Sequence, residues 1–402
     1  MAWAARAGAR LLLPMDESPL LPSAKLAFAE FFAGIGLVRM GLERAGWRCV
    51  FANDIDAQKL KMYQDHFSDA EEHFVLGDIR NLSPLDIPPI QLATASFPCT
   101  DLSLAGGRRG LAGEQSGALW PFLEVLRHLR TVRPTLVMLE NVVGFLSSHG
   151  GGDFRSALRA LNELGYAVDA FVVDAAHFVP QSRPRLFVIG SLPPGGSIAS
   201  PQRDLFYEFV ESEHRPAQLI SFIKSNPDIR WSIRDLPPFP KRSTQLSELL
   251  EDLAEDDSSW WSEERSAYLL NQMSDRHRLV AERMIASGEI TVGTVFRRVR
   301  NGRSMAELRT NGTAGCLRTP KGGSGRQILF VAGEGRYRVR LLSPRECARL
   351  MGADDFVLDV PLNQALFGFG DAVCVPVIEW IGRNYLTPLV SKADLKEVAT
   401  AE

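Results

Sequence analysis

The stretch LAFAEFFAGIGLVRMGLERAGWRCVFAND, residues 26–54, decides the fold class of this chain. It begins with an apolar run typical of a buried strand, turns at Gly34 and Gly36, and continues with helical spacing from residue 37 to residue 45. A second apolar run follows at Cys49–Ala52. A strand, a glycine turn, a helix and another strand form the repeating unit of a parallel sheet.

This unit recurs as far as residue 190. We expect a helix through Tyr63, and further strands and helices in alternation. The expected strands lie at Phe74–Leu76, Leu92–Ala95, Leu136–Leu139, Phe171–Asp174 and Leu186–Ile189, and the helices at Trp120–Arg130 and Phe154–Leu164. The pattern predicts an α/β fold with a doubly wound, mostly parallel sheet. Such sheets bind ligands at the carboxyl edge of their strands.

The composition is that of an ordinary folded protein. The 402 residues are 45% hydrophobic and 23% charged, which excludes collagen-like, disordered and disulfide-scaffold classes. Five cysteines without a CxxC pair argue against a zinc site or a disulfide framework and favour a reducing, cytoplasmic setting. No apolar run approaches 18 residues, so we expect no membrane span, and residues 1–24 are interpreted as an N-terminal extension.

The alternation stops near Ser191, and Pro193–Gly196 marks a boundary. The formal net charge of -3 hides a segregation of charge beyond that point. We expect an acidic helix at Leu246–Asp257, whereas residues 265–326 hold 12 Lys and Arg against 4 Asp and Glu. After residue 335 the pattern is globular again, and it predicts helices near Pro344–Met351 and Val375–Tyr385.

Polar or small residues follow several of the expected strands. FFAGIG at residues 31–36 can turn tightly around a ligand, and Asp54 and Asp78 can bind the hydroxyl or amino groups of a nucleoside-type cofactor. Taken alone, each of these residues could equally well serve only to form a turn at the end of its strand. Together, three strand ends of this kind favour a cofactor of the adenosine type.

Groups with reactive chemistry follow the next strands. Cys99 lies in SFPCTDLS after a strand, where a thiol is exposed enough to act as a nucleophile once it is activated. Glu140 begins ENV after another strand, and Arg183 and Arg185 lie in QSRPR before a third. The competing interpretations are an unreactive turn cysteine and ordinary salt-bridge partners. The sheet topology would bring all four side chains to one crevice.

These motifs, in this order, resemble those of the C5-cytosine DNA methyltransferases. The resemblance covers residues 26–190 and 336–385. It rests on FFAGIG, the strand ends at Asp54 and Asp78, FPCTDLS, ENV, QSRPR, RLLSPRECARLMG at 340–352 and GDAV at 370–373.

The resemblance implies S-adenosylmethionine as the cofactor. In relatives the residue matching Asp54 binds the ribose, and the residue matching Asp78 binds the adenine amino group. Three positions differ from the residues that are frequent in this family: Ile55 replaces an aromatic residue, Leu37 replaces a glycine, and Asp371 replaces an asparagine. These differences concern individual contacts with the cofactor. The implied cofactor-binding residues are Phe32, Gly34, Gly36, Asp54, Ile55, Asp78, Ile79, Pro98, Asp371 and Ala372.

The resemblance also implies a mechanism. Cys99 would attack C6 of a cytosine flipped out of the duplex, and Glu140 would hold its N3/N4 edge. Arg185, aided by Arg183, would bind the O2 side. C5 would then take the methyl group, and loss of the C5 proton would expel Cys99.

Residues 191–362 would form a target-recognition domain, with 191–335 as its variable part and 336–362 as a return motif. Residues 25–190 and 363–402 would form the catalytic domain. Double-stranded DNA is the implied partner of a monomeric enzyme in a bacterial restriction-modification or host-protection system. A cognate restriction endonuclease would act on the same sequence. The implied DNA contacts are Ser103, Arg108, Arg109, Arg297, Arg298, Arg300, Lys321 and Arg326, with Arg303 and Arg318 as further candidates.

Three rival functions remain open. The first is an RNA cytosine methyltransferase of the same architecture, which the long basic region argues against. The second is a catalytically silent DNA-binding relative, and the intact Cys99, Glu140 and Arg185 argue against it. The third is a nucleotide-binding oxidoreductase, which would leave Pro-Cys and ENV unexplained. We expect the other cysteines (49, 316, 347 and 374) to be packing residues.

Overall fold

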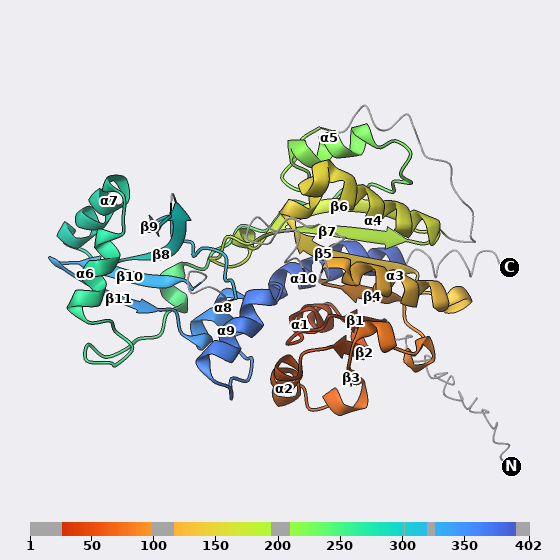
Figure 1. Ribbon diagram of the computed structural model, residues 1–402, viewed down its shortest axis with the longest axis horizontal. Coiled ribbons are helices and arrows are strands. Elements are labelled where there is room, and N and C mark those ends of the chain that lie inside the picture. Colours follow the sequence, from red (N-terminus) through yellow and green to blue (C-terminus); the bar gives the residue numbers. More distant parts are fainter. Residues whose placement is uncertain (1–25, 99–115, 194–209, 301, 320–325, 391–402) are drawn as a thin grey trace, which may run out of the picture.

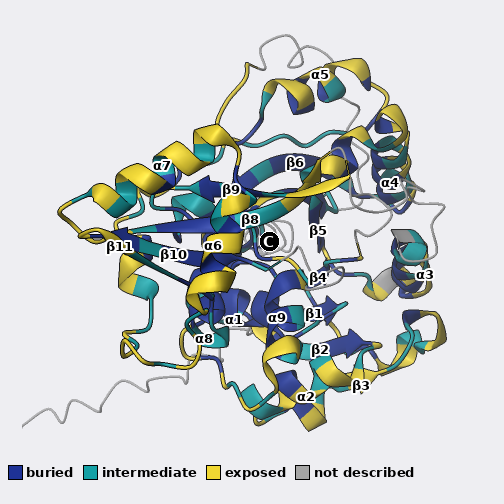
Figure 2. Cartoon of the chain, turned by 60° about the vertical axis from the view of Figure 1, so that its left-hand side comes forward, coloured by how far each residue is buried: buried dark blue, intermediate teal, exposed yellow. Residues whose placement is uncertain are grey.

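A computed structural model describes residues 26–98, 116–193, 210–300, 302–319 and 326–390. Two lobes lie side by side, a larger one built on a seven-stranded sheet and a smaller one built on a four-stranded sheet (Figure 1). Each lobe has buried strands and exposed outer helix faces (Figure 2).

The large sheet confirms the predicted fold class. Its strand order is β3-β2-β1-β4-β5-β7-β6. Six strands run parallel, and β7 alone is antiparallel to both of its neighbours. The order reverses between β1 and β4, which makes this point the expected ligand crevice. The strands are β1 Ala27–Phe31, β2 Arg48–Asp54, β3 Phe74–Leu76, β4 Leu92–Ala95, β5 Leu136–Val142, β6 Ala167–Asp174 and β7 Pro184–Ser191.

Helices cover both faces of this sheet. Strand residues alternate between two apolar clusters, as Phe28 and Phe31 of β1 do, because successive side chains of a strand point to opposite faces. The first face packs against α1 Leu37–Arg44, α2 Ala57–His66, α8 Pro344–Leu350, α9 Leu362–Asp371 and α10 Val375–Ile381, and the second against α3 Leu119–His128, α4 Gly152–Glu163 and α5 Ala217–Ser225.

The end of the described chain completes the N-terminal core. Helix α10 lies so close to α1 that a Cβ on Gly41 would fall 2.6 Å from Cβ of Ile378. Only glycine permits this approach. The stretch Leu362–Val390 has the length and hydropathy of a membrane span, and 61% of its most apolar window is buried inside the structure. Burial of this kind is found in core helices of globular proteins.

Residues 210–234 pack on the large sheet. Arg215 forms an ion pair with Asp169 of β6 at 2.9 Å, and both side chains are buried. Tyr385 donates its hydroxyl proton to the same carboxylate. Trp231 bridges to Val168 alongside β6. The domain boundary at residue 191 stays a prediction, and these contacts attach residues 210–234 to the large lobe.

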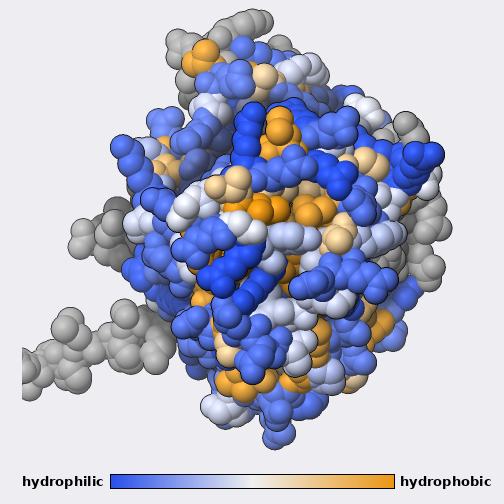
Figure 3. Space-filling model, turned by 90° about the vertical axis from the view of Figure 1, so that its left-hand side faces the viewer, coloured by the Kyte–Doolittle hydropathy of each residue, from blue (hydrophilic) through white to orange (hydrophobic). Residues whose placement is uncertain are grey.

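The small lobe is an antiparallel sheet with two helices on one face. Its order is β11-β10-β8-β9, and a third apolar cluster joins the sheet to the helices. No strand was predicted in this region. The apolar run Ile328–Gly333 and the alternation in Arg336–Leu341 are strand signals that the prediction did not use, whereas Arg297, Arg298 and Arg300 obscure the alternation of β8. The elements are α6 Glu263–Asn271, α7 Asp275–Ala286, β8 Thr291–Arg300, β9 Arg303–Arg309, β10 Ile328–Gly333 and β11 Arg336–Leu341. The side of this lobe seen in Figure 3 is mainly hydrophilic, with apolar side chains between the charged ones.

The predicted acidic helix at Leu246–Asp257 is wrong. Only a short 3-10 turn, Leu246–Leu249, forms there, and the rest is irregular. Acidic residues that follow one another without basic partners three or four residues away repel in a helix. The spacing of Leu246, Leu249, Leu250 and Leu253 favours a helix, but Leu246, Leu249 and Leu250 pack against the first apolar cluster without a continued helix.

Candidate active site

The loop after β4 leads toward Cys99. Pro98 is exposed, and Cys99 itself lies outside the described residues, as do Ser103, Arg108, Arg109 and Lys321. The backbone just before Pro98 is held by Asn141 of β5, whose buried side-chain amide donates to the carbonyl oxygen of Phe97 at 3.0 Å. The second residue of the ENV motif therefore fixes the base of the loop that carries the candidate nucleophile.

Glu140 and Arg185 form the central ion pair of the site. Nε of Arg185 lies 3.0 Å from Oε1 of Glu140, and the Glu140 side chain is 8% exposed. Burial raises the pKa of Glu140, while the positive charges of Arg185 and Arg183 oppose that rise. A buried carboxyl group whose pKa is raised holds a proton more readily than an exposed one.

Arg183 is turned into the protein interior. Its guanidinium donates to the carbonyl oxygens of Leu317 at 2.8 Å and Gly370 at 3.0 Å, and also to that of Ala372. Burial, followed by the charge of Arg185, lowers the pKa of Arg183. Arg183 thus ties β7 to the segment before residue 319 and to the end of α9. Its predicted catalytic role stays a prediction.

Two residues that contact the QSRPR segment in the fold, or belong to it, were not predicted as site residues from the sequence. Gln181 is fully buried and fastens the motif to α8 and to the segment before residue 319, because its side-chain amide donates to the Leu350 carbonyl oxygen at 2.7 Å and accepts from the Leu317 amide at 3.0 Å. Cys316 was expected to be a packing residue. It is half-buried, and its sulfur lies 3.2 Å from Nη1 of Arg183. Gln181 could have been predicted as a site residue, because it begins the QSRPR motif. No motif in the sequence pointed to Cys316.

The glycine turn after β1 has the strained geometry of a ligand-binding loop. Phe32, Gly34 and Gly36 all have left-handed backbones, with φ of 57°, 59° and 83°. A Cβ on Gly36 would lie 2.4 Å from the ring of Phe67, so this position requires glycine. A non-glycine residue such as Phe32 rarely adopts φ above zero, and such residues concentrate at functional sites.

The acidic residue at the end of β2 supports this turn. One carboxylate oxygen of Asp54 accepts from the Gly34 amide at 2.8 Å, and the other accepts from the Asp56 amide at 2.9 Å. Beside it, Ile55 is 67% exposed. This exposed aliphatic side chain provides an apolar surface at the carboxyl end of β2, beside the strand that carries the glycine turn.

The remaining predicted cofactor residues lie near the same edge. Asp78 forms an ion pair with Arg80, whose hydrogen bonds lower the pKa of Asp78, and Ile79 is buried. Asp371 ends α9 and pairs with Lys59 of α2 at 3.0 Å. Among the described residues, no group of three or more His, Cys, Asp or Glu side chains could hold a metal ion.

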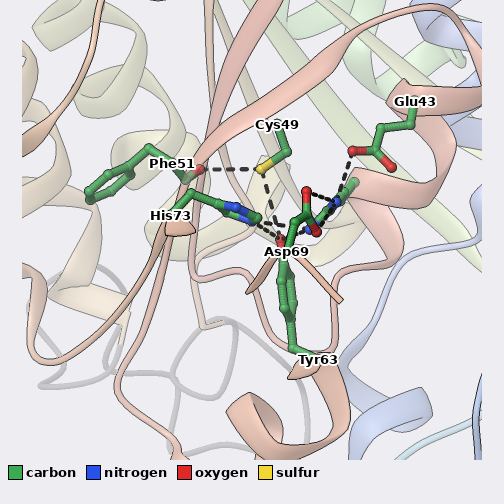
Figure 4. A network of polar contacts seen from close by, with 7 residues as sticks. Glu43, Cys49, Phe51, Tyr63, Asp69 and His73 are labelled. Atoms are coloured by element: carbon green, nitrogen blue, oxygen red, sulfur yellow. Dashed lines mark hydrogen bonds and ion pairs between the residues drawn. The ribbon is translucent and has the colours of Figure 1, made fainter. Parts of the chain in front are cut away.

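A polar network lies behind the glycine turn (Figure 4). The buried guanidinium of Arg39 donates to Asp69 at 2.7 Å, to Glu43 at 2.8 Å and to the Tyr63 hydroxyl at 3.2 Å. The same hydroxyl lies 3.1 Å from Nε2 of His73. The network ties α1 to α2 and to the loop before β3, and so it holds the first strand–helix unit together.

Some of the arginines predicted to contact DNA are paired with other side chains of the protein, and others are exposed to solvent. Arg300 pairs with Glu307 at 2.7 Å, and Arg298 lies 3.9 Å from the same carboxylate. Arg297 donates to Gln272 at 3.0 Å. Arg326 donates to Asn363 at 2.5 Å. Arg303 and Arg318 are exposed.

The fold and the strand-end residues together define a Rossmann-like methyltransferase. The sequence profile for C-5 cytosine-specific DNA methylases matches residues 26–387. The chain belongs to this family and is a DNA (cytosine-5-)-methyltransferase.

Relatives with similar sequences span nearly the whole chain. The type II methyltransferase M.Bsp6I of Bacillus sp. (strain RFL6) is 28% identical, over 89% of this chain and 98% of its own length. The type II methyltransferase M.BsuFI of Bacillus subtilis is 29% identical, over 88% of this chain and 71% of its own length. Among solved structures, the methyltransferase EhMeth of Entamoeba histolytica has a TM-score of 0.61 at 15% identity. That match covers 92% of this chain and 98% of EhMeth, and it supports the fold alone.

Proposed function

We propose that the enzyme transfers a methyl group from S-adenosylmethionine to C5 of a cytosine flipped out of a specific short duplex DNA sequence. The transfer passes through a covalent bond between Sγ of Cys99 and C6 of the base. The observation that carries this proposal is the buried Glu140–Arg185 ion pair beside the loop that leads to Cys99. A carboxyl group and a guanidinium side by side match the polar edge of a pyrimidine.

The residues at the switch point fit S-adenosylmethionine. The left-handed turn of Phe32, Gly34 and Gly36 brings backbone close to a ligand, and Ile55 presents an exposed apolar face. Asp54 and Asp78 would meet the ribose and the adenine, supported by Ile79, Pro98, Asp371 and Ala372. When bound, S-adenosylmethionine supplies the methyl group.

The polar side chains act on the base. Cys99 adds to C6 as a thiolate, the π electrons of the C5=C6 double bond shift to form C4=C5, and those of C4=N3 move onto N3, where the charge is shared with O2. Because burial raises the pKa of Glu140, this carboxyl group can hold a proton against N3 while Arg185 binds O2. C5 becomes nucleophilic and is methylated. A base then removes the C5 proton, and the C6–S bond breaks to release Cys99.

Residues 191–362 are the proposed target-recognition domain, with 191–335 as its variable part and 336–362 as the return motif. The small lobe lies within this range, whereas residues 210–234 pack on the large sheet. Flipping a base costs a few kcal/mol of stacking, which contacts to phosphates and bases must offset. The basic segment at residues 265–326 suits that purpose. Arg297, Arg298 and Arg300, together with Ser103, Arg108, Arg109, Lys321 and Arg326, are the proposed DNA contacts.

The proposed biological setting follows from the names of the relatives. M.Bsp6I and M.BsuFI are called type II methyltransferases. We infer that this chain is a monomeric cytoplasmic enzyme that protects bacterial DNA from a cognate restriction endonuclease acting on the same sequence. The RNA methyltransferase alternative shares the fold, so the nucleic acid must be tested directly.

Sequencing of bisulfite-treated DNA tests this proposal. DNA from cells that lack other cytosine methylation but express this chain should carry 5-methylcytosine within one short sequence. A Cys99→Ala variant should leave that sequence unmethylated. Purified enzyme should transfer radiolabelled methyl groups to duplex DNA in preference to transfer RNA. Unmethylated DNA in the presence of folded, cofactor-binding enzyme would refute the proposal, and preference for transfer RNA would support the alternative.

A further inference from the structure

Lys59 and Asp371 form an ion pair between two helices that are distant in sequence. Nζ of Lys59, in the first turn of α2, lies 3.0 Å from Oδ2 of Asp371, the last residue of α9. The Lys59 side chain is 22% exposed and that of Asp371 is 51% exposed, so neither is sealed inside the core. Burial alone would lower the pKa of Lys59, but nearby carboxylates, chiefly Asp371, raise it, and the ammonium group keeps its proton at neutral pH.

The pair lies next to the glycine turn that follows β1. A Cβ on Gly368 of α9 would fall 3.0 Å from Cγ2 of Ile35 in this turn and 3.0 Å from Cε of Met62 in α2. Lys59 and Asp371 are each three residues away from these contact points on α2 and α9, and side chains at this spacing share one face of a helix. The ion pair is therefore about 5 Å along each helix from the place where the helices meet the turn.

The backbone around Asp371 is fixed on its other side. Arg183 donates to the carbonyl oxygens of Gly370, at 3.0 Å, and of Ala372. A Cβ on Gly370 would also lie 2.5 Å from the backbone nitrogen of Thr319. Because the end of α9 is packed this closely, Asp371 is a stationary partner for the long and flexible side chain of Lys59.

The order of the strands indicates which end of the cofactor would face this pair. In the proposed function, Asp78 after β3 meets the adenine and Asp54 at the end of β2 meets the ribose. The next strand in the sheet is β1, which carries the glycine turn. The sulfonium and the methionyl end follow the ribose in the covalent structure of S-adenosylmethionine, so an extended cofactor places its methionyl end over this turn. That end carries one carboxylate and one ammonium group.

We propose that Lys59 is a further cofactor-binding residue, whose ammonium group, held by Asp371, pairs with the carboxylate at the methionyl end of S-adenosylmethionine. A lysine ammonium has three donors, and one carboxylate such as Asp371 does not exhaust them. This inference rests on the proposed function, because it extends the cofactor site assigned there. Lys59 was not among the residues predicted to bind the cofactor.

Decarboxylated S-adenosylmethionine, which lacks only that carboxylate, makes the test specific. Isothermal titration calorimetry with the whole chain measures the Kd of each cofactor form. Lys59→Met should weaken binding of S-adenosylmethionine by roughly 10- to 100-fold, the loss expected when a hydrogen bond between charged groups is removed. The same substitution should change the Kd of the decarboxylated form by less than about twofold, because its partner is already missing. Lys59→Arg keeps a cation and should recover most of the affinity.

Lys61→Met is the matched control. Lys61 lies in the same helix, but its partner is Asp65 at 2.8 Å rather than a residue beside the glycine turn. This variant should bind both cofactor forms as the wild type does. An Asp371→Asn background separates a direct contact with the cofactor from mere neutralisation of Asp371. In that background, Lys59→Met should still weaken binding of S-adenosylmethionine.

Four results would each overturn the inference. They are wild-type affinity of Lys59→Met for S-adenosylmethionine, equal weakening of both cofactor forms, a Lys59→Arg variant as weak as Lys59→Met, and no effect of Lys59→Met in the Asp371→Asn background. A wild-type enzyme that binds S-adenosylmethionine but methylates no DNA would instead refute the proposed function alone, so the two failures can be distinguished.

Discussion

Arg185 reaches Glu140 because β7 runs against the direction of the other strands. The register pairs Glu140 with Phe187 and Val142 with Arg185, so Arg185 is the diagonal neighbour of Glu140 on the same face of the sheet. An antiparallel strand begins at the edge where the parallel strands end. The single reversed strand therefore delivers a guanidinium to the carboxyl edge, where the loop toward Cys99 also starts.

Replacing Glu140 with glutamine should abolish most of the activity and leave the fold intact. The amide has the same shape but cannot exchange a proton with N3, and it leaves Arg185 without its carboxylate. We expect kcat to fall by roughly 10²- to 10⁴-fold, the usual contribution of a proton-transferring group, with little change in the KM for S-adenosylmethionine. Glu163→Gln, on the exposed face of α4, is the control. A Glu140→Gln enzyme with wild-type kcat would contradict the assigned role.

Asn141→Asp removes one hydrogen-bond donor from the base of the catalytic loop. The carboxylate still accepts from the Val142 amide, as the Asn141 side chain does at 2.9 Å, but it cannot donate to the Phe97 carbonyl oxygen. We expect a loss of about 1–3 kcal/mol in the free energy of unfolding, because a buried carbonyl loses its partner. Urea denaturation measures the loss. Stability equal to that of the wild type would show that the Phe97 contact contributes nothing.

Arg340 and Glu346 form the most buried ion pair in the described part of the chain. Each side chain is 1% exposed, and two hydrogen bonds of 2.7 Å and 2.6 Å join them. Arg340→Met leaves the Glu346 carboxylate buried without its cation, which should cost about 3–5 kcal/mol. Arg383→Met breaks a more exposed pair with Glu379 and should cost less than about 1 kcal/mol. Equal losses in thermal unfolding would contradict the role of burial.

Glu30 should make the protein less stable as pH rises. Burial raises the pKa of this β1 carboxyl group to about 8, so its proton is held in the folded state and lost first from the unfolded chain. The stability that Glu30 contributes is present at acidic pH and is lost between about pH 4.5 and pH 8. Glu30→Gln stays neutral throughout and should gain roughly 3–5 kcal/mol over wild type across that interval.

Chemical unfolding at several pH values measures this difference. Glu264→Gln, an exposed substitution on α6, should show no such trend. A Glu30→Gln variant whose stability runs parallel to that of the wild type at every pH would show that the Glu30 carboxyl group does not hold a proton in the folded protein.

The sheet and its strand ends were accessible from the sequence because their signals are local. Phe74–Leu76 and Leu92–Ala95 form strands as predicted, and Ile55 and Pro98 are exposed as strand-end residues should be. The direction of β7 was not accessible, since an apolar run carries no information about which way its partner runs.

The rest depended on long-range contacts. In the small lobe, Arg297, Arg298 and Arg300 obscure the alternation of β8, whereas β10 and β11 had local strand signals that the prediction did not use. Residues 215–225 join the large lobe through contacts with residues far away in sequence, Phe222 with Phe154 and Arg215 with Asp169. Cys316 was expected to be a packing residue, because its hydrogen-bond partner, the Arg183 guanidinium, lies 133 residues away in sequence. Such contacts become visible only when the chain is folded.

The contact of α10 with α1 determines which lobe can fold first while the chain is being synthesised. The first apolar cluster joins Phe28 to Val390, so a ribosome must translate the stretch between α1 and Val375 before that core can close. At about 5–20 residues per second this takes roughly 15 to 65 seconds. The strands of the small lobe are complete by Leu341, and their cluster draws on nearby residues alone. A nascent chain can therefore finish the small lobe first, and the core of the large lobe is completed only when α10 packs against α1.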